Sequence, residues 1–398
     1  MKIALIADTF PPLRTSGAVQ LRDLSLEFIK QGHDLTVILP SGLQKEGYIL
    51  EYHNGIRVIR LKTMITKDIG YYKRTLSEAL MPFFMLWHLQ KSPLSLEKWD
   101  GVVFYSPSIF LAPIAKYISK MSCCKCYLII RDIFPEWAAD LGLMGRGLPY
   151  YFFKAVAYYQ YSVADIIGVQ TSGNLSYFDS WQQGDGRKLE VLENWLGPPE
   201  NMTCSISVKQ TNLSGRKILV YAGNMGVAQG MDILIDLAEK LQYRHDVGFL
   251  FVGRGSDVKK LILSVSKRQL SNVIFFDEID PGQIPKLYSQ CIAGIVALNP
   301  EHKSHNIPGK FLTYMQNGLP VLANLNAGND LAELIRTYQV GQVCESNDID
   351  DLVNLTELLL DQIDNDHNIF IRCKQLFHEK FSSKLAVKKI IDSLSVSI

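Results

Sequence analysis

The feature of this 398-residue sequence that most limits its fold is a series of short, almost uninterrupted apolar runs. Each run is followed by a glycine-rich or polar loop and then by a longer amphipathic stretch. Strands buried on both faces of a parallel sheet have this composition, whereas strands with one solvated face alternate apolar and polar residues. We place runs at 2–7, 35–39, 101–105, 126–130, 166–170, 189–192, 217–222, 247–252, 273–276 and 293–298, with a further candidate at 57–62. The order strand, loop, helix predicts an α/β fold of doubly wound parallel sheets.

The runs fall into two sets that are separated by residues 194–215, a stretch rich in Pro, Ser, Thr, Asn and Gly. Such composition is typical of a link between domains. We therefore predict a first Rossmann-like domain over residues 1–196, a linker over 197–216 and a second Rossmann-like domain over 217–375. Residues 376–398 are predicted to form a closing helical segment.

Composition excludes some function classes. The chain is 47% apolar and 20% charged, with a formal net charge of +1, so it can bury large cores but offers no electrostatic footprint for nucleic acid. An odd number of cysteines, seven, and the absence of a secretion signal favour the reducing cytosol. The longest uncharged apolar run, 80–87, is far below the roughly 18 residues that indicate a membrane span.

A loop, a helix start and one early lysine are predicted to meet between residues 305 and 318. Asn306 is a candidate helix cap, Pro308 suits the first turn, and Gly318 ends the helix. Lys310 then lies beside the free N–H groups and the positive end of the helix dipole, an arrangement that binds anions. An ordinary αβ corner with a solvated lysine explains the same residues.

Glycine turns follow two strands of the second half, one at Gly223-Asn224 and one at Gly253-Arg254. Arg254 is a candidate phosphate ligand, because a guanidinium fork matches phosphate oxygens. The alternative is a simple loop arginine. In the first half, the turn after the first strand holds Ser16 and Gly17 but lacks the GxGxxG pattern, which disfavours a nicotinamide-dependent oxidoreductase.

Charged residues directly follow the strand at 126–130, at the sheet edge where α/β proteins place their clefts. Asp132 and Glu136 are candidates for acid, base or acceptor of hydrogen bonds from sugar hydroxyls. A helix-start aspartate and a solvated glutamate explain them equally well.

Two aromatic, base-flanked segments stand out at 71–91 and 148–161. They are interpreted either as core helices beneath the sheet or as a partly exposed apolar surface that lies on a membrane without crossing it.

Five segments, in this order and spacing, resemble the GT-B glycosyltransferases, specifically retaining family 4: SGAVQLRDLSLEFIKQGHDLTVI, LVYAGNMGVAQGMDILIDLAEKL, FLFVGRGSD, NVIFFDEID and KFLTYMQNGLPVLANLNAGNDLAELI. The stretch RDIFPEWAADLGL is most similar to bacterial transferases that build O-antigen or capsule repeat units, including the N-acetyl-fucosamine transferase subgroup. The resemblance covers nearly the whole chain. It implies two Rossmann-like domains that face each other across a cleft, with the C-terminal helix packing back on the first domain.

The sequence departs from the family pattern at four positions. Many members carry two glutamates around the helix start, and the matching residues here are His305 and Thr313. The second glutamate usually holds the nucleotide ribose, so Thr313 would make a weaker contact. An arginine and a lysine that often hold the diphosphate are replaced by the uncharged Asn224 and Gln229.

The resemblance implies a UDP-sugar donor, with Lys310 and Arg254 stabilising the leaving diphosphate and Asp132 contacting the reacting sugar or the acceptor hydroxyl. Glu136 is a second carboxylate candidate. Neither a metal nor a further cofactor is expected. The donor-binding residues expected by this resemblance are Ser16, Gly17, Gly223, Asn224, Gln229, Gly253, Phe276, Glu278, Ile279, Asn306, Pro308, Gly309 and Thr313.

The implied function is transfer, with retention, of N-acetyl-fucosamine or another N-acetylhexosamine to a saccharide linked to undecaprenyl diphosphate. This places the protein in the cytoplasm, peripheral at the inner face of the cytoplasmic membrane, in O-antigen or capsule biosynthesis. Two alternatives remain open, namely a sugar-nucleotide 2-epimerase of the same fold and a non-catalytic sugar-nucleotide-binding partner of a transferase. The missing glutamates favour the second alternative.

Overall fold

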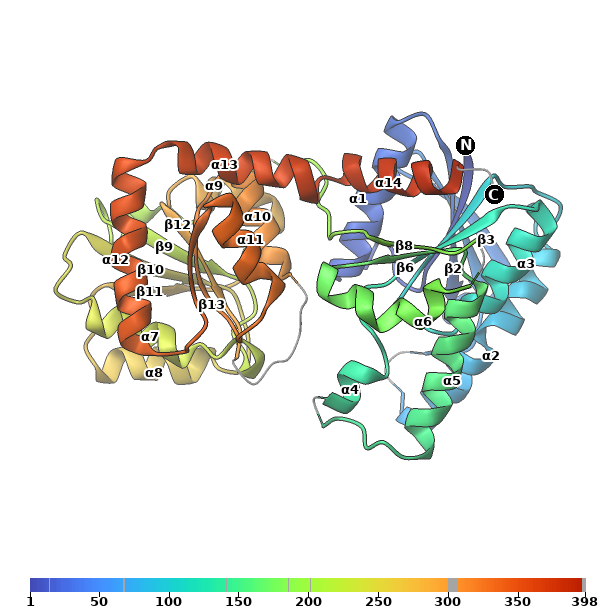
Figure 1. Ribbon diagram of the computed structural model, residues 1–398, viewed down its shortest axis with the longest axis horizontal. Coiled ribbons are helices and arrows are strands. Elements are labelled where there is room, and N and C mark those ends of the chain that lie inside the picture. Colours follow the sequence, from blue (N-terminus) through green and yellow to red (C-terminus); the bar gives the residue numbers. More distant parts are fainter. Residues whose placement is uncertain are drawn as a thin grey trace. The chain divides into compact units, whose positions relative to one another are not determined.

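The computed structural model describes residues 1–13, 15–66, 69–140, 142–184, 186–200, 202–299 and 307–395. The chain divides into two compact units (Figure 1). The first unit contains Met1–Gly197 and the C-terminal segment from Ser383, and the second contains Pro198–Ser382.

The described part of the first unit is built on an eight-stranded sheet with the order β3-β4-β2-β1-β5-β6-β7-β8. All neighbouring pairs are parallel except β3 with β4. The strand β1 is central, and its residues Ile3 to Ile6 are fully buried. The bounds are β1 (Lys2–Ile6), β2 (Asp34–Ser41), β3 (Tyr48–His53), β4 (Ile56–Lys62), β5 (Gly101–Tyr105), β6 (Lys125–Ile129), β7 (Ile166–Val169) and β8 (Lys188–Val191).

Helices cover both faces of this sheet (Figure 1). On one face, α2, α3 and α5 form a core that includes Met85, Ile114 and Ala157. On the other face, α1 and α14 bury Leu24 and Val387. The bounds are α1 (Ser16–Lys30), α2 (Tyr71–Gln90), α3 (Ala112–Ser122), α4 (Glu136–Asp140), α5 (Leu148–Val163), η1 (Ser172–Phe178), α6 (Asp179–Gln182) and α14 (Ser383–Ser395).

The described part of the second unit is built on a six-stranded, wholly parallel sheet with the order β11-β10-β9-β12-β13-β14. Its strands are β9 (Lys217–Ala222), β10 (Val247–Val252), β11 (Val273–Phe276), β12 (Ala293–Ala297), β13 (Val321–Asn324) and β14 (Gly341–Cys344). Its helices are η2 (Val208–Gln210), η3 (Val227–Gln229), α7 (Asp232–Lys240), α8 (Val258–Lys267), η4 (Pro281–Gln283), α9 (Ile284–Tyr288), α10 (Gly309–Asn317), α11 (Asp330–Tyr338), α12 (Ile349–Asn365), α13 (Asn368–Leu376) and η5 (Phe377–Phe381).

The predicted pair of parallel α/β sheets is confirmed, with three local differences. The edge strands β3 and β14 were not predicted. Residues 376–382, predicted to be part of the closing helix of the first domain, belong to the second unit, because the helical path breaks at Ser382, which has extended backbone angles. Trp195, which lies in the polar stretch that separates the two halves, is fully buried against the first sheet and donates its indole N–H to Gln20 at 2.7 Å.

The two aromatic segments form α2 and α5, and each has one buried and one exposed face. On α2, Met81, Met85 and Leu89 are buried, while Phe83 is 64% and Trp87 51% exposed. Each helix therefore packs one face into the core, as one interpretation predicted, and the membrane-surface interpretation stays a prediction. In the described ranges, no helix combines the length and the apolar character that crossing a bilayer requires.

Candidate functional site

Two glycine turns of the second unit lie directly against each other at the carboxyl ends of β9 and β10. The N–H of Gly223 donates to Val252 at 2.9 Å, and the N–H of Met225 donates to Arg254 at 2.8 Å. Gly253 has a φ of +146°, and a Cβ there would lie 2.0 Å from the Gly223 carbonyl oxygen. No side chain fits that approach, so glycine is required for the two turns to meet.

Lys310, in the first turn of α10, extends across this glycine pair. Its ammonium donates to the Tyr221 hydroxyl at 2.5 Å, and its Cε would lie 3.7 Å from a Cβ built on Gly223. Among the described residues it has no carboxylate partner in ion-pair range. Burial lowers the pKa of this lysine to about 7, because a desolvated ammonium without a counter-charge is disfavoured. An anion bound here would supply the missing charge.

Lys310 is the second residue of α10. The helix ends at Gly318 in a left-handed conformation, as predicted, but it begins at Gly309 with the extended Pro308 as its N-cap, so the prediction that Pro308 lies inside the first turn is wrong. Among the described residues, which do not include 300–306, nothing lies within 4 Å of the position that a Gly309 side chain would take. Free N–H groups at this end can therefore reach an anion. The predicted cap Asn306 and the departure at His305 lie outside the described residues.

The other residues at predicted phosphate-binding positions are either exposed or hydrogen-bonded to each other. The Arg254 side chain is 80% exposed and pairs with Glu278 at 3.1 Å, a surface contact that stabilises little. Asn224 donates its amide to the Gln229 oxygen at 3.0 Å, and the same oxygen accepts the Gly226 N–H at 3.1 Å. The neutral pair thus closes the glycine turn on itself.

The remaining residues of this unit that are predicted to bind the sugar donor differ in whether their polar atoms are already hydrogen-bonded. The Thr313 hydroxyl donates to Gly309 of its own helix at 3.2 Å, so its proton is already engaged. The carbonyl of Phe276 accepts the Gly253 N–H at 3.0 Å, which leaves it one lone pair. Ile279, half-buried, follows Glu278 in the loop after β11.

In the first unit, Asp132 lies just beyond β6, next to a buried guanidinium. Arg131 stacks over the Trp195 ring at 4.2 Å and is only 6% exposed. Burial lowers the Arg131 pKa, and the nearby Tyr105 hydroxyl and Asp132 carboxylate counteract that effect. Asp132 itself is half-buried. The structure therefore brings a carboxylate, a guanidinium and a phenol together at this edge.

The loop that carries Ser16 and Gly17 lies beside the same edge. A Cβ on Gly17 would be 3.3 Å from the Tyr105 hydroxyl. Ser16 is exposed at the first position of α1, whose cap Thr15 accepts the Ala18 N–H at 3.3 Å. Ser16 and Gly17 are thus close to the Tyr105 side of the Asp132 cluster.

The Glu136 carboxylate is mostly buried and is not freely solvated. Its side chain is 18% exposed, and one oxygen lies 3.4 Å from the Lys154 ammonium and 3.4 Å from the Tyr150 hydroxyl. The solvated-glutamate interpretation is therefore wrong for this residue.

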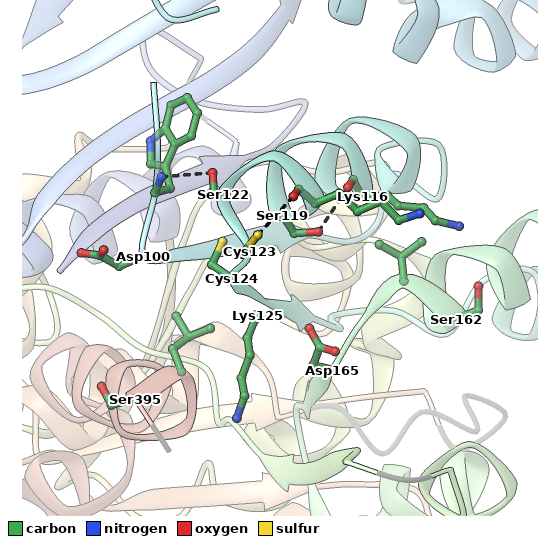
Figure 2. A pocket seen from close by; sticks show the side chains of 14 residues that line it. Asp100, Lys116, Ser119, Ser122, Cys123, Cys124, Lys125, Ser162, Asp165 and Ser395 are labelled. Atoms are coloured by element: carbon green, nitrogen blue, oxygen red, sulfur yellow. Dashed lines mark hydrogen bonds between the residues drawn. The ribbon is translucent and has the colours of Figure 1, made fainter. Parts of the chain in front are cut away.

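A pocket of about 700 Å³ lies at the opposite, amino-terminal edge of the first sheet (Figure 2). The final residues of α3, α5 and α14 all contribute to it, so three negative helix ends meet there. The wall also carries lysines, and a cation is favourable near a negative helix end. The lysines therefore do not indicate a bound ligand. Its lining consists of Trp99, Asp100, Lys116, Ser119, Lys120, Ser122, Cys123, Cys124, Lys125, Ser162, Val163, Asp165, Leu394 and Ser395.

A match to a known protein family covers the site in the second unit. Residues 205–373, all within the second unit, match the family model described as glycosyl transferases group 1. The match includes both glycine turns and Lys310.

Two relatives match over a longer range. The chain is 23% identical over 380 residues to an Escherichia coli (strain K12) protein named as a colanic acid biosynthesis glycosyl transferase, WcaI, covering 86% of this chain and 88% of the relative. It is 22% identical over 286 residues to a Pseudomonas aeruginosa protein named as the glycosyltransferase WbjE, covering 69% and 70%.

Solved structures agree on the fold. The Anabaena protein HepE, in complex with UDP, superposes with a TM-score of 0.68 at 16% identity, covering 99% of this chain and all of that one. WaaG, a glycosyltransferase involved in lipopolysaccharide biosynthesis, superposes with a TM-score of 0.65 at 16% identity, again over 99% and 100%. The GT-B fold predicted from the sequence is confirmed.

Several residues of the site were not predicted. Tyr221, Tyr105 and Arg131 each contact a predicted residue, yet each is part of, or adjacent to, an apolar strand. The available signal is positional, because all three lie at the carboxyl end of a parallel strand, where clefts form.

Proposed function

We propose that the chain is a retaining glycosyltransferase that transfers a sugar from a UDP-sugar to a lipid-linked saccharide. The observation that carries the proposal is the Lys310 ammonium, which lies between the start of α10 and the glycine turns and has no carboxylate in ion-pair range among the described residues. The group 1 domain and the UDP seen in HepE support the donor class.

Catalysis in this proposal depends on the leaving group. As the sugar–oxygen bond breaks, negative charge grows on the diphosphate. Lys310 and the aligned N–H groups of α10 stabilise that charge more than they stabilise the ground state, and this difference lowers the barrier. Arg254 is exposed enough to leave Glu278 and add a second cation. Neither a metal nor another cofactor has a role in this scheme.

Asp132 contacts the reacting sugar or orients the acceptor hydroxyl. The buried Arg131 guanidinium lies beside this carboxylate. Asn224 and Gln229 line the turn near the diphosphate as neutral hydrogen-bonding groups, and Phe276, Glu278 and Ile279 border the base. Ser16 and Gly17 contribute N–H groups at the start of α1.

The donor sugar is N-acetyl-fucosamine or another N-acetylhexosamine, by similarity of the RDIFPEWAADLGL stretch. The name of the Escherichia coli relative, a colanic acid biosynthesis glycosyl transferase, supports a place in surface-polysaccharide biosynthesis, which in this proposal is of the O-antigen or capsule type. The acceptor in this proposal is a saccharide on undecaprenyl diphosphate.

Exposed apolar stripes support a lipid-linked acceptor. On α2, Tyr72, Leu76, Phe83 and Trp87 are 95%, 58%, 64% and 51% exposed, and their spacings of four, seven and four residues place them along one side of the helix. On α5, the exposed apolar residues are Leu148, Tyr151, Phe152, Tyr158 and Tyr159. Because α3 packs against both helices, the two stripes belong to one helical layer.

We propose that this layer lies on the inner face of the cytoplasmic membrane. The Lys91 ammonium is 3.9 Å from the Trp87 ring centroid, and Lys73 and Arg74 are exposed at the start of α2. Aromatic rings with basic neighbours suit the headgroup region of an anionic bilayer. Replacing Phe83, Phe84 and Trp87 with Ser should abolish binding to vesicles that contain phosphatidylglycerol.

Leu263→Ser is the matched control, because Leu263 is 62% exposed on α8 of the second unit. This variant should sediment with vesicles as the wild type does. Unchanged binding of the triple Ser variant would refute the membrane proposal.

The donor proposal is tested by thermal shift with UDP, GDP and dTDP and their sugars, followed by transfer to a lipid-linked acceptor. Binding to the folded state alone raises the melting temperature. UDP-hexoses should give the largest shift, and product should form only with the acceptor present. Release of a new sugar from the donor alone would support an epimerase instead, and binding without any product would support a non-catalytic partner.

A further inference from the structure

The segment that carries Asp132 leaves the first sheet with little main-chain support. Ile130 donates its N–H to Gly168 at 2.9 Å, the final contact of this strand with β7. Among the described residues, the main-chain hydrogen bonds beyond it stay local, such as Phe134 to Asp132 at 3.1 Å and Trp137 to Ile133 at 3.1 Å. The position of this segment therefore depends on its side chains.

Those side chains attach the segment to α5. The Phe134 ring meets the Phe153 ring edge to face, with centroids 5.2 Å apart. Two residues further along, the carboxylate of Glu136 accepts from Tyr150 and Lys154, each at 3.4 Å, and these two groups are 3.3 Å from each other. One ring contact and one shared polar contact thus hold residues 132–136 on the helix.

The second oxygen of Glu136 is not available to a substrate. It is buried, with no hydrogen-bond partner in range among the described residues. The Glu136 carboxylate also raises the pKa of Tyr177, after burial and Tyr161, so the carboxylate as a whole lies against this tyrosine cluster. A general acid or base must reach the reacting group, whereas both oxygens here are directed into a cluster of tyrosines and one lysine.

We propose that Glu136 is a positioning residue: through Lys154 and Tyr150 it fixes the Asp132-bearing segment on α5. This inference rests on the proposed function, in which Asp132 meets the acceptor. It replaces the catalytic role that the sequence suggested for Glu136. The same helix presents the exposed residues Tyr151 and Phe152 on its other side. Helix α5 would therefore position both a lipid-linked acceptor and Asp132.

Conservative and non-conservative variants separate positioning from catalysis. Glu136→Gln keeps an oxygen that can accept from Tyr150 and Lys154, so it should recover most of the activity that Glu136→Ala loses. We expect Glu136→Ala to lower kcat about 10- to 100-fold, the scale of a roughly 1 Å misplacement, with the KM for the donor and the pH profile unchanged. Lys154→Met should lower kcat in the same direction, and the double variant should be no worse than Glu136→Ala alone.

Lys116→Met is the matched control. The Lys116 ammonium lies 5.4 Å from the Tyr159 ring centroid, the same distance as Lys154 from the Tyr150 ring, but Lys116 belongs to α3. This variant should keep wild-type kcat. If Glu136→Gln lost as much activity as Asp132→Asn, Glu136 would be catalytic and the inference would be overturned. Wild-type kcat in both Glu136→Ala and Lys154→Met would overturn it as well.

Hydrogen exchange supplies a readout that needs no turnover. Peptides covering residues 131–140 should exchange faster in Glu136→Ala and Lys154→Met than in the wild type and Lys116→Met, while peptides of the second unit stay unchanged. Unchanged exchange at 131–140 would refute the positioning role. A wild-type protein that binds UDP-sugar but transfers nothing would instead refute the proposed function, and exchange would still decide this inference.

Discussion

Lys310 makes donor binding sensitive to pH in a direction that can be calculated. Its pKa in the free protein is lowered to about 7 by burial. A bound diphosphate favours the ammonium, and an opposite charge in contact restores a lysine pKa by several units, to about 9 or above. Binding should therefore take up a proton wherever the free lysine is neutral, that is, above pH 7.

The magnitude follows from these two pKa values. At pH 8 the free amine is about 10% protonated and the bound one about 90%, so uptake should be about 0.8 proton per donor bound. Between pH 6 and pH 8.5 the protonated fraction of the free site falls about 30-fold, and the affinity should fall by a similar factor. A UDP-hexose is the appropriate ligand, because both of its phosphates are esterified and their charge is constant over this range.

The assay is titration calorimetry at pH 8 in two buffers that differ in ionisation enthalpy. Lys310→Arg keeps its charge throughout and should bind without proton uptake, whereas Lys310→Met should bind weakly and with no pH dependence. A wild-type affinity that is flat from pH 6 to 8.5, with no proton uptake, would refute the assignment of Lys310 to the diphosphate.

Three further outcomes are expected. Lys310→Met should raise the melting temperature at pH 6, where the wild type holds a buried ammonium, and the difference should shrink towards pH 9; an equal shift at both pH values would contradict the burial argument. Gly253→Ala should cost about 2–4 kcal/mol of unfolding free energy in urea titrations, because its Cβ would lie 2.0 Å from the Gly223 carbonyl oxygen, whereas Gly309→Ala should stay within about 0.5 kcal/mol of the wild type. Removal of divalent ions with EDTA should leave transfer unchanged, and activity that is lost and then restored by Mg²⁺ would show that Lys310 and Arg254 do not suffice.

The architecture could be predicted because its strands carry their own signal. Residues such as Ile3 to Ile6 and Phe249 to Val252 are apolar at every position, since parallel strands are covered on both faces. The strand β3 has no such signal. Its sequence YILEYH is only partly buried and is defined by antiparallel pairing of Tyr48 with Leu61, a contact that local sequence does not specify.

The candidate site was predictable only in part, for the same reason. A lysine in the first turn of a helix was evident, but its burial depends on Tyr221, which is 89 residues away in the sequence. Likewise, an acidic residue after β6 was evident, whereas the lysine and tyrosine that bind Glu136 come from the next helix. Sequence patterns locate groups at a sheet edge but do not say which of them meet.

The central claim is that the diphosphate of the donor lies on the start of α10, beside the Lys310 ammonium and the glycine turns. A crystal structure of the full chain with a UDP-hexose tests it most directly. We expect phosphate oxygens within hydrogen-bond distance of the Lys310 Nζ and of main-chain N–H groups at Gly309 and Lys310. A donor bound elsewhere, or a Lys310 that still contacts only Tyr221 while the donor is bound, would contradict the account.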